Sequence, residues 1–504
     1  MHACLNVDEI IRFIVHQLVR SRAKAAAVAL ACCCKSLEDP VLDVLWEAQD
    51  GLLPLLKSLP ADVWNEGECT VSAPITHISS SLNSFTRKSF KRPPTTLEWA
   101  RFRKYAQKIR ELIDYGYQPP VSSEVFSVLE HRAVGAPLFP HLKTLELWFV
   151  TEKTIPFIHL FLSPSNTIVK IVFISSDYPT EMIAQMITAF PTLCPNLQGI
   201  TFNSMPRDPI ITAAVSGMLL SCNRNALRSI CVDSPLTEEA REVIFKLPSL
   251  RELLVIIERE VSLPSMVLPN LTTLAMVYDG DGDWLPMFRG ATFGKLEAVT
   301  FNHRSEQIGD FLEIFERVAL DTSVQNTLTE FCLHTSRSWN PNYSSLLPFT
   351  QLTDVTIEFS CDDGCSSRLD DDIITKMARA MPKLQFLVLG NSPCREVSIG
   401  VTVEGLVALA AHCPGLSELC IHFQVDSLRE PPATTRTPPN VEPTALRRDC
   451  ALRVLVVGKI LMPEGSVPTI ALTIARIFPH LKYIDSIDQK WMEVVDAVRL
   501  QKNG

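Results

Sequence analysis

Three consecutive cysteines, Cys32, Cys33 and Cys34, are the first residues in the sequence whose type suggests chemistry. Thiolates bind zinc, but a structural zinc site needs C-x₂₋₄-C pairs together with further Cys or His ligands. Neighbouring side chains on a helix point in different directions, so three in a row cannot share one ion. We therefore expect no metal here, and we expect Cys32 and Cys33 to fill a helix interface as small apolar groups.

Three other stretches imitate ligand-binding motifs without completing them. Residues 290–296 (GATFGKL) have one residue too few between the glycines of a P-loop, and Leu296 stands where a hydroxyl must bind Mg²⁺. Residues 279–290 begin like a calcium loop, but Trp284 occupies the glycine position and Gly290 the glutamate position. Cys361 and Cys365 have no matching second pair. With no G-x-S-x-G and no H-E-x-x-H, the sequence predicts a protein without cofactor that is not an enzyme.

The composition indicates a soluble, intracellular protein. Of its 504 residues, 46% are hydrophobic and 20% charged, and 47 basic against 56 acidic residues give a net charge of −9. Nine basic residues gather between Arg87 and Arg110, which we interpret as a solvated linker and helix face, with an anionic partner as the alternative. We expect no nucleic-acid partner, because polyanion binders are basic.

Cysteine usage and hydropathy point to the cytoplasm or the nucleus. The 15 cysteines are scattered, as is typical of free thiols in a reducing compartment. Asp8 and Glu9 stand where a signal peptide would be positive. Since no stretch reaches the 18 or so apolar residues of a membrane span, we expect no membrane contact.

The first fifty residues predict three short helices. Val7, Ile10, Ile11, Ile14, Val15 and Leu18 form one helical stripe, with Asn6 as the cap. Ser21 is expected to cap a second helix whose stripe is Ala25, Val28, Ala29, Cys32 and Cys33. Asp39-Pro40 is expected to start a third that carries Val41, Leu42, Leu45 and Trp46. So small a unit has more apolar surface than it can bury, so it must pack on the rest of the chain or on a partner.

These helices resemble an F-box. Glu9-Ile10-Ile11, with Ile14 and Leu18, is similar to its first helix, and the run from Cys34 through Glu38-Asp39-Pro40 to Leu45-Trp46 is similar to its closing segment. F-box proteins bind a Skp-type adaptor and join SCF-type ubiquitin ligases. The resemblance implies adaptor-facing or core positions for Ile10, Ile11, Ile14, Cys34, Pro40, Leu45 and Trp46. The alternative is that the helices only cap the segment that follows.

A recurring motif fills most of the remaining chain. Seven segments share a proline two residues before a leucine: 139–147, 194–202, 247–255, 268–276, 381–389, 413–421 and 478–486. Three more, 293–301, 349–357 and 450–457, keep the apolar spacing without the proline, and weaker members start at Ile168, Leu227 and Leu328. Helical patterns precede several units, at 181–190, 371–380, 403–412 and 469–478. Because proline stops a helix, each unit predicts a helix, a stop and a short strand.

The motif resembles irregular leucine-rich repeats of the kind that follow an F-box. The resemblance implies a solenoid, and the absence of the usual asparagine at the ninth position predicts an uneven horseshoe. Alternate strand residues are expected on the concave side, where they would bind a target protein: Thr144, Glu146, Trp148, Thr201, Asn203, Thr300, Asn302, Thr356, Glu358, Glu418, Cys420 and His422.

The predicted architecture is therefore α/β, with a three-helix F-box-like module followed by an irregular leucine-rich-repeat horseshoe. We expect the module at 1–48, a linker with a capping helix (97–112) at 49–138, repeats at 139–487, a proline-rich loop at 426–449 and a closing helix at 488–504. The predicted function is a substrate-recognition adaptor of an SCF-type ubiquitin ligase. The alternative is a non-enzymatic interaction scaffold.

Overall fold

The computed structural model is a mixed α/β protein whose strands run mainly in parallel. It divides into two compact units, Met1–Ala240 and Arg241–Gly504. The residues that it describes are 7–69, 85–115, 121–133, 135–175, 177–258, 266–279, 291–303, 322–335, 343–359, 369–390, 400–424, 450–458, 465–486 and 489–503.

The first unit begins with three helices, α1 (Asp8–Arg20), α2 (Lys24–Cys33) and α3 (Lys35–Glu47). Two of the expected starts are wrong. Ser21 ends α1 and Ala23 precedes α2, while α3 begins after the extended residue Cys34 and contains Pro40 in its interior. The earlier start of α3 puts Leu37 into the core of the module, and burial of that side chain offsets the backbone hydrogen bond that Pro40 cannot donate. The predicted cap Asn6 lies outside the described residues.

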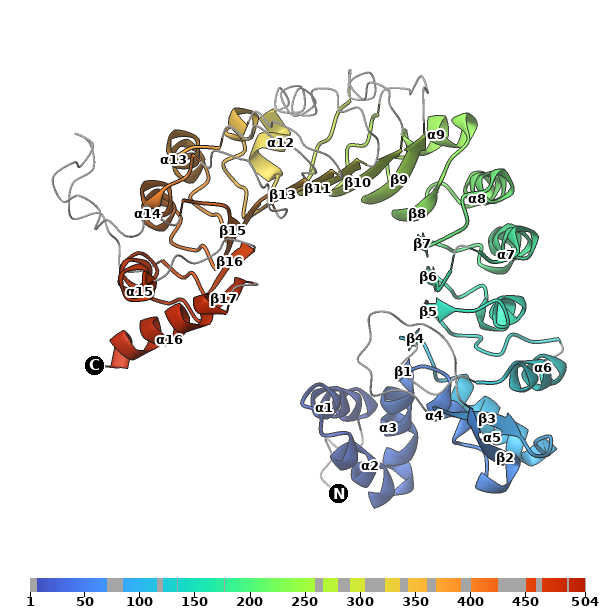
Figure 1. Cartoon of the computed structure of the whole chain (residues 1–504). Helices are drawn as coiled ribbons and strands as arrows, with labels where there is room; N and C mark the ends of the chain where they lie inside the picture. Colours follow the sequence, from blue (N-terminus) through green and yellow to red (C-terminus); the bar gives the residue numbers. More distant parts are fainter. Residues whose placement is uncertain are drawn as a thin grey trace. The chain divides into compact units, whose positions relative to one another are not determined.

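A row of parallel strands continues from these helices. The order within the unit is β1-β4-β5-β6-β7-β8, and helices α7 and α8 lie on one side of the row (Figure 1). The hairpin of β2 and β3 is antiparallel and separate. The elements are β1 (Ala48–Asp50), α4 (Leu53–Leu56), η2 (Ala61–Val63), β2 (Trp64–Cys69), β3 (Phe85–Phe90), α5 (Thr96–Ala106), β4 (Glu111–Asp114), α6 (Ser123–Arg132), β5 (Thr144–Val150), η3 (Ile155–Phe161), β6 (Ile168–Phe173), α7 (Thr180–Leu193), β7 (Gly199–Asn203), α8 (Pro209–Ser221) and β8 (Ser229–Pro235).

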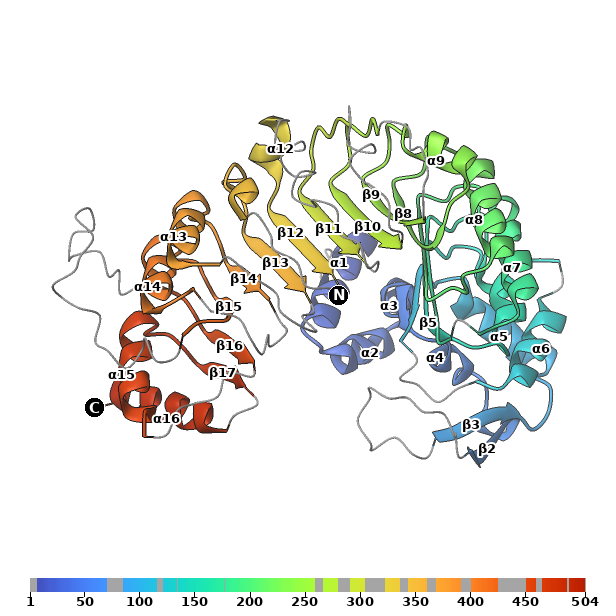
Figure 2. The same cartoon turned by 45° about the horizontal axis from the view of Figure 1, so that its top comes forward.

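The second unit repeats the same arrangement. Its strands pair in chain order from β9 to β17, all in parallel, and α13, α14 and α15 lie on one side of them (Figure 2). Helix α9 (Glu238–Ile244) crosses the division between the units. The elements are β9 (Glu252–Glu258), β10 (Thr273–Asp279), β11 (Ala298–His303), α12 (Thr322–Thr327), β12 (Glu330–Thr335), η4 (Tyr343–Leu346), β13 (Asp354–Phe359), α13 (Asp371–Ala380), β14 (Phe386–Leu389), α14 (Val403–His412), β15 (Glu418–Ile421), β16 (Val454–Gly458), α15 (Val467–Ile477), β17 (Tyr483–Ser486) and α16 (Lys490–Asn503).

The predicted strand positions are confirmed. Strands begin two residues after the first leucine of the motif, as at Leu142 and β5, Leu250 and β9, and Leu481 and β17. These leucines are buried, and the residue after most of them donates its backbone N–H to the matching carbonyl of the preceding helix–strand repeat, as Gln198 does to Thr167 at 2.7 Å. A row of backbone hydrogen bonds therefore joins consecutive repeats of the motif at this position.

One weaker member of the motif is out of register. Strand β6 starts at Ile168 itself, and its pairing with β5 and β7 puts Asn166 at the position of Leu142. Asn166 is fully buried there, where its side-chain oxygen accepts hydrogen bonds from the Ser163 backbone N–H at 2.5 Å and the Cys194 thiol at 3.6 Å. The search for apolar residues at this position missed Asn166, because Asn166 is polar. Its burial is possible because its side-chain oxygen accepts hydrogen bonds.

The helix expected at 97–112 is also corrected. Helix α5 ends at Ala106, and strand β4 follows. Leu97, assigned to the apolar stripe, is 84% exposed, whereas Trp99 and Phe102 are buried. Ile109 and Leu112 are buried at the positions that Leu142 and Leu145 occupy in the first predicted repeat, because β4 pairs with β5. Residues 109–114 are therefore one further copy of the motif. A row of strands thus begins earlier in the chain than the motif predicted.

The C-terminal helix agrees with its predicted pattern. Trp491, Val494, Val495 and Val498 are all buried on α16. The proline-rich stretch 426–449 lies outside the described residues, as do Cys361, Cys365 and most of the calcium-like stretch. None of the described helices is both long and apolar enough to cross a membrane.

Candidate functional site

The three N-terminal helices share a small apolar core. Its members are the buried residues Ile11, Val15, Ala27, Leu37, Val41 and Val44. Partly buried apolar residues pack against these six: Leu18, Val19, Leu30, Ala31, Cys34 and Leu45. The core is still small for three helices, since a core in a unit of this size contributes about 3–5 kcal/mol at most. The module therefore depends on further contacts.

Helix α2 turns a different face to this core than the spacing predicted. Ala27 is buried, whereas Cys32 and Cys33 are exposed and Val28 is 50% exposed. The expectation that Cys32 and Cys33 fill a helix interface is therefore wrong for this chain. Because α2 is apolar on almost every side, spacing alone does not determine which stripe faces inward. In the described residues no three His, Cys, Asp or Glu side chains gather closely enough to hold a metal.

Helix α1 also exposes apolar side chains outside the core. Phe13 is 64% exposed, Ile10 39% and Val7, at its N-cap, 41%. Burying one such side chain against a partner contributes about 1.5–3 kcal/mol. On α2, Val28 and its neighbours Ala25, Ala29, Cys32 and Cys33 are also exposed. We use the name α1–α2 apolar surface for the exposed apolar side chains of the two helices taken as a set: Val7, Ile10, Phe13, Ala25, Val28, Ala29, Cys32 and Cys33.

The residues expected to meet an adaptor do not share one environment. Ile11 and Pro40 are buried in the module, and Ile10 is exposed. The other four are half-buried: Ile14, Cys34, Leu45 and Trp46. Val7, Phe13 and Val28 were not assigned to the adaptor site on the basis of the sequence. Phe13 is apolar and lies outside the predicted stripe of α1, so the sequence already indicated an exposed apolar side chain there.

Trp46 packs against the same chain. Its ring stacks on Tyr105 of α5 with centroids 4.6 Å apart. One helical turn earlier, the Asp43 carboxylate pairs with Arg12 at 2.5 Å and also with Lys108. Burial opposes ionisation of Asp43, but the hydrogen bonds and charges of Lys108 and Arg12 hold its pKa below the usual value. Helix α3 is thereby fixed to α5, and part of the basic run at 87–110 is paired within the chain.

The residues expected to bind a target protein, on alternate positions of the strands, do share one environment. All of the predicted target-contacting residues are half-buried, except Cys420, which is buried: Thr144, Glu146, Trp148, Thr201, Asn203, Thr300, Asn302, Thr356, Glu358, Glu418 and His422. The strand register aligns them, since Glu146 lies beside Lys170 and Thr300 beside Cys332, which lies beside Thr356. Burial lowers the pKa of His422, so its imidazole favours the neutral form. Within each unit this face of the strands is a continuous strip.

A charged and aromatic cluster marks the strip in the first unit. Lys170 Nζ lies 4.2 Å from the centre of the Trp148 ring and 3.8 Å from Glu146 Oε2. The Trp148 indole N–H donates to the same carboxylate oxygen at 3.3 Å. Tyr115 lies 5.9 Å from Trp148, ring centre to ring centre. Aromatic rings held in place by such contacts are favoured at protein interfaces.

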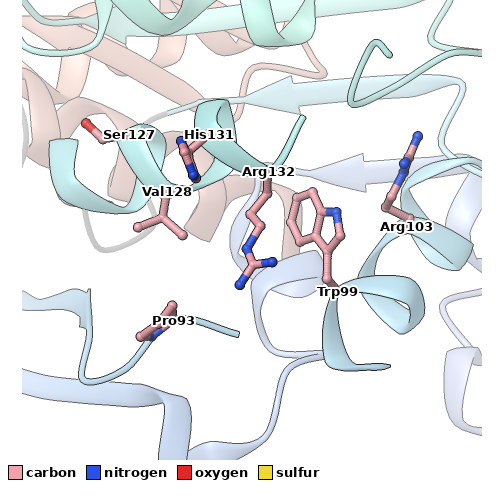
Figure 3. A pocket seen from close by; sticks show the side chains of 7 residues that line it. All are labelled: Pro93, Trp99, Arg103, Ser127, Val128, His131 and Arg132. Atoms are coloured by element: carbon pink, nitrogen blue, oxygen red, sulfur yellow. The ribbon is translucent and has the colours of Figure 1, made fainter. Parts of the chain in front are cut away.

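A pocket of about 780 Å³ is lined by α5, α6 and Pro93 (Figure 3). Ser127 and His131 lie one turn apart on α6, a spacing that could suggest a hydroxyl and its base. The Ser127 hydroxyl instead donates to the Ser123 carbonyl at 3.1 Å, and Arg132 donates to the Pro94 carbonyl at 2.8 Å. These contacts stabilise the fold and do not activate a nucleophile.

Comparison with protein-family models and with curated proteins found no match for this chain.

Proposed function

We propose that the chain is a substrate-recognition subunit of an SCF-type ubiquitin ligase. In this proposal α1–α3 are an F-box that docks a Skp-type adaptor, and the units of helix and strand are irregular leucine-rich repeats whose strand strip binds a target protein. The protein performs no chemistry itself, and raises the concentration of its target near the ligase in the cytoplasm or the nucleus.

The observation that carries the proposal is the α1–α2 apolar surface. A module with only six buried core residues leaves Phe13, Ile10 and Val28 exposed to water. Several exposed apolar side chains on so small a module favour a protein partner. The parallel strands, most of which begin two residues after a buried leucine, support the repeat assignment.

A second candidate function is a scaffold in which α1–α3 only cap the strands. The stacking of Trp46 on Tyr105 and the pairing of Asp43 with Lys108 favour it, because they use residues of α3 inside the chain. The two proposals differ in what the α1–α2 apolar surface contacts.

The first prediction separates them by co-purification of the full chain with a Skp-type adaptor. Phe13→Asp and Ile10→Asp should each weaken adaptor binding at least about 30-fold, since a charge at an interface anchor costs about 2 kcal/mol or more. Leu97→Asp is the matched control, because Leu97 is equally apolar and even more exposed, at 84%, on α5. It should leave binding unchanged.

Trp46→Ala is a poor test of docking, because it also removes the Tyr105 contact and so affects stability. Circular dichroism should show the Phe13 and Ile10 variants folded, since both side chains lie outside the core. Absent binding by the wild-type chain, or binding that Phe13→Asp and Ile10→Asp leave intact, would exclude the adaptor proposal and favour the scaffold.

A further inference from the structure

Three side chains of the second unit form a hydrogen-bonded relay. Cys332 and His334 lie two residues apart on β12, so both side chains point to the same face of the strand. The Cys332 Sγ atom lies 3.0 Å from His334 Nε2, and His334 Nδ1 lies 2.7 Å from Glu358 Oε2 on β13. The strand register explains the second contact, because His334 and Glu358 are direct neighbours.

The chemistry of the three groups fixes where the protons lie. An ionised carboxylate only accepts hydrogen bonds, so His334 Nδ1 carries the proton that is donated to Glu358. The Nε2 atom then keeps its lone pair and accepts the thiol hydrogen of Cys332. This is the order of contacts by which a histidine, oriented by an acid, acts as a general base on a nucleophile.

We propose that Cys332 is a nucleophilic thiol, activated by His334 and oriented through Glu358, that is modified by small α,β-unsaturated carbonyl compounds. The sulfur attacks the β-carbon, forming the S–C bond while the C=C π bond breaks. The thiol proton passes to His334 Nε2 and is then delivered to the α-carbon. Nothing leaves, and no oxidant or other reactant is needed. The proposal is independent of adaptor binding.

An electrophile of this class suits the site for two reasons. Addition needs a base for the thiol and then an acid for the carbon, and a single imidazole supplies both. The side chains of His334 and Glu358 are 39% and 32% exposed, and Cys332 is half-buried, so a small molecule can reach them from solvent.

The resting state of the thiol makes the proposal testable. Burial and the charge of Glu358 raise the pKa of Cys332 to about 11. Without assistance, such a thiol would react roughly 300-fold more slowly than an ordinary cysteine at neutral pH, because so little of it is thiolate. Assistance by His334 removes that deficit, since the proton is transferred during the attack.

The second prediction is read from N-ethylmaleimide modification of the full chain, followed by tryptic digestion and mass spectrometry. The peptide 318–337 contains Cys332 as its one cysteine. The peptide 25–35 contains Cys32, Cys33 and Cys34, and fragmentation of that peptide separates the exposed Cys32 as an internal reference. We expect wild-type Cys332 to react within about 30-fold of the rate of Cys32. A slower reaction overturns the proposal without any variant being needed.

Variants then assign the roles. His334→Gln should slow the modification of Cys332 at least about 100-fold, the usual range of general-base assistance. Glu358→Ala should slow it about tenfold, and Glu358→Gln, which still accepts the Nδ1 proton, should restore part of the rate. Cys32 should react equally in every variant, which shows that the reagent is unchanged, and circular dichroism should show each variant folded. A Cys332 rate unaffected by His334→Gln means that the relay only stabilises the strands.

Discussion

Arg92 joins three segments of the first unit through its guanidinium group. It donates to both carboxylate oxygens of Glu98 on α5, at 2.9 and 2.8 Å, and to Asp62 in η2 at 2.7 and 3.1 Å. Glu98 also accepts from the backbone N–H of Thr95, which completes a capping box at the start of α5. The hydrogen bonds from Arg92 and then from Thr95 lower the pKa of Glu98 from 4.5 to about 2.

The third prediction concerns the pH dependence of this contact. A carboxyl with a lowered pKa in the folded state contributes stability above its ordinary pKa, and loses it as the pH falls toward the folded-state value. Glu98→Gln should therefore lower the melting temperature at pH 7, and the difference from wild type should shrink between pH 4.5 and about 2. The melting temperatures of both proteins are measured by thermal unfolding, with circular dichroism as the signal.

An exposed carboxylate provides the control for this experiment. Glu152→Gln, in the turn after β5, removes one acidic group of the same unit and should change the melting temperature little at any pH. A difference between Glu98→Gln and wild type that stays constant down to pH 2 would contradict the role given to Arg92.

Single residues were the least predictable level of this protein. The burial of Leu142 or Val494 follows from periodicity, because many similar positions reinforce it. The fate of Cys32 does not, since α2 offers two apolar stripes and only tertiary packing chooses between them. One partner of Asn166, the Cys194 thiol, is distant in sequence, and the contact of His334 with Glu358 is set by strand register. No local pattern announces such contacts.

At the scale of elements, prediction succeeded where proline and leucine act together. Helices α7, α13, α14 and α15 and the strands after them lie where the motif predicted, because the proline of the motif follows each helix end and the buried leucine sets the strand. Helix α7 is longer than the expected 181–190, because it continues through Pro191 to Leu193. Helix α5 was placed too long, because Ile109 and Leu112 fit both a helical stripe and a strand site. The resemblance to an F-box stays a prediction.

Neighbouring helices are joined by a cap that crosses from one to the next. Asp371, in the first turn of α13, accepts the backbone N–H groups of Thr402 and Gly405 at 2.8 and 2.9 Å and the Thr402 hydroxyl at 2.7 Å. These N–H groups belong to the start of α14, where the first N–H groups of a helix have no acceptor within the helix itself. One carboxylate therefore links two consecutive helix–strand repeats of the second unit.

The fourth prediction follows from that cap. Asp371→Ala should lower the free energy of unfolding by about 1–3 kcal/mol, because it leaves partly buried N–H groups without an acceptor. Asp372→Ala is the matched control, since Asp372 is exposed and pairs with Lys376 one turn away, a contact worth about 0.3–0.5 kcal/mol. Urea unfolding compares the two. Equal losses would show that the contact with α14 contributes nothing.

At the scale of the whole molecule, the chain order of the strands is the property that matters for stability. From β4 onward, the strands within each of the two units pair with their neighbours in the sequence, as β16 does with β15 and β17. In such an arrangement each unit of helix and strand contacts mainly the units beside it, so stability is a sum of local terms. The motif predicted this order, because sequential copies of one helix–strand unit stack most simply side by side. It contained no signal for the division after Ala240.

The last prediction tests this locality at the C-terminal end. Trp491 on α16 is fully buried and meets Phe423 edge to face, with ring centres 6.3 Å apart. Trp491→Ala should cost about 3–5 kcal/mol, and hydrogen exchange should accelerate in α15, β17 and α16 while β5–β8 of the first unit keep their protection. Met492→Ala, at the neighbouring and 46% exposed position, should leave exchange unchanged throughout. Equal acceleration in β5–β8 would mean that the chain unfolds as one cooperative body, because the loss in the second unit would then reach strands of the first.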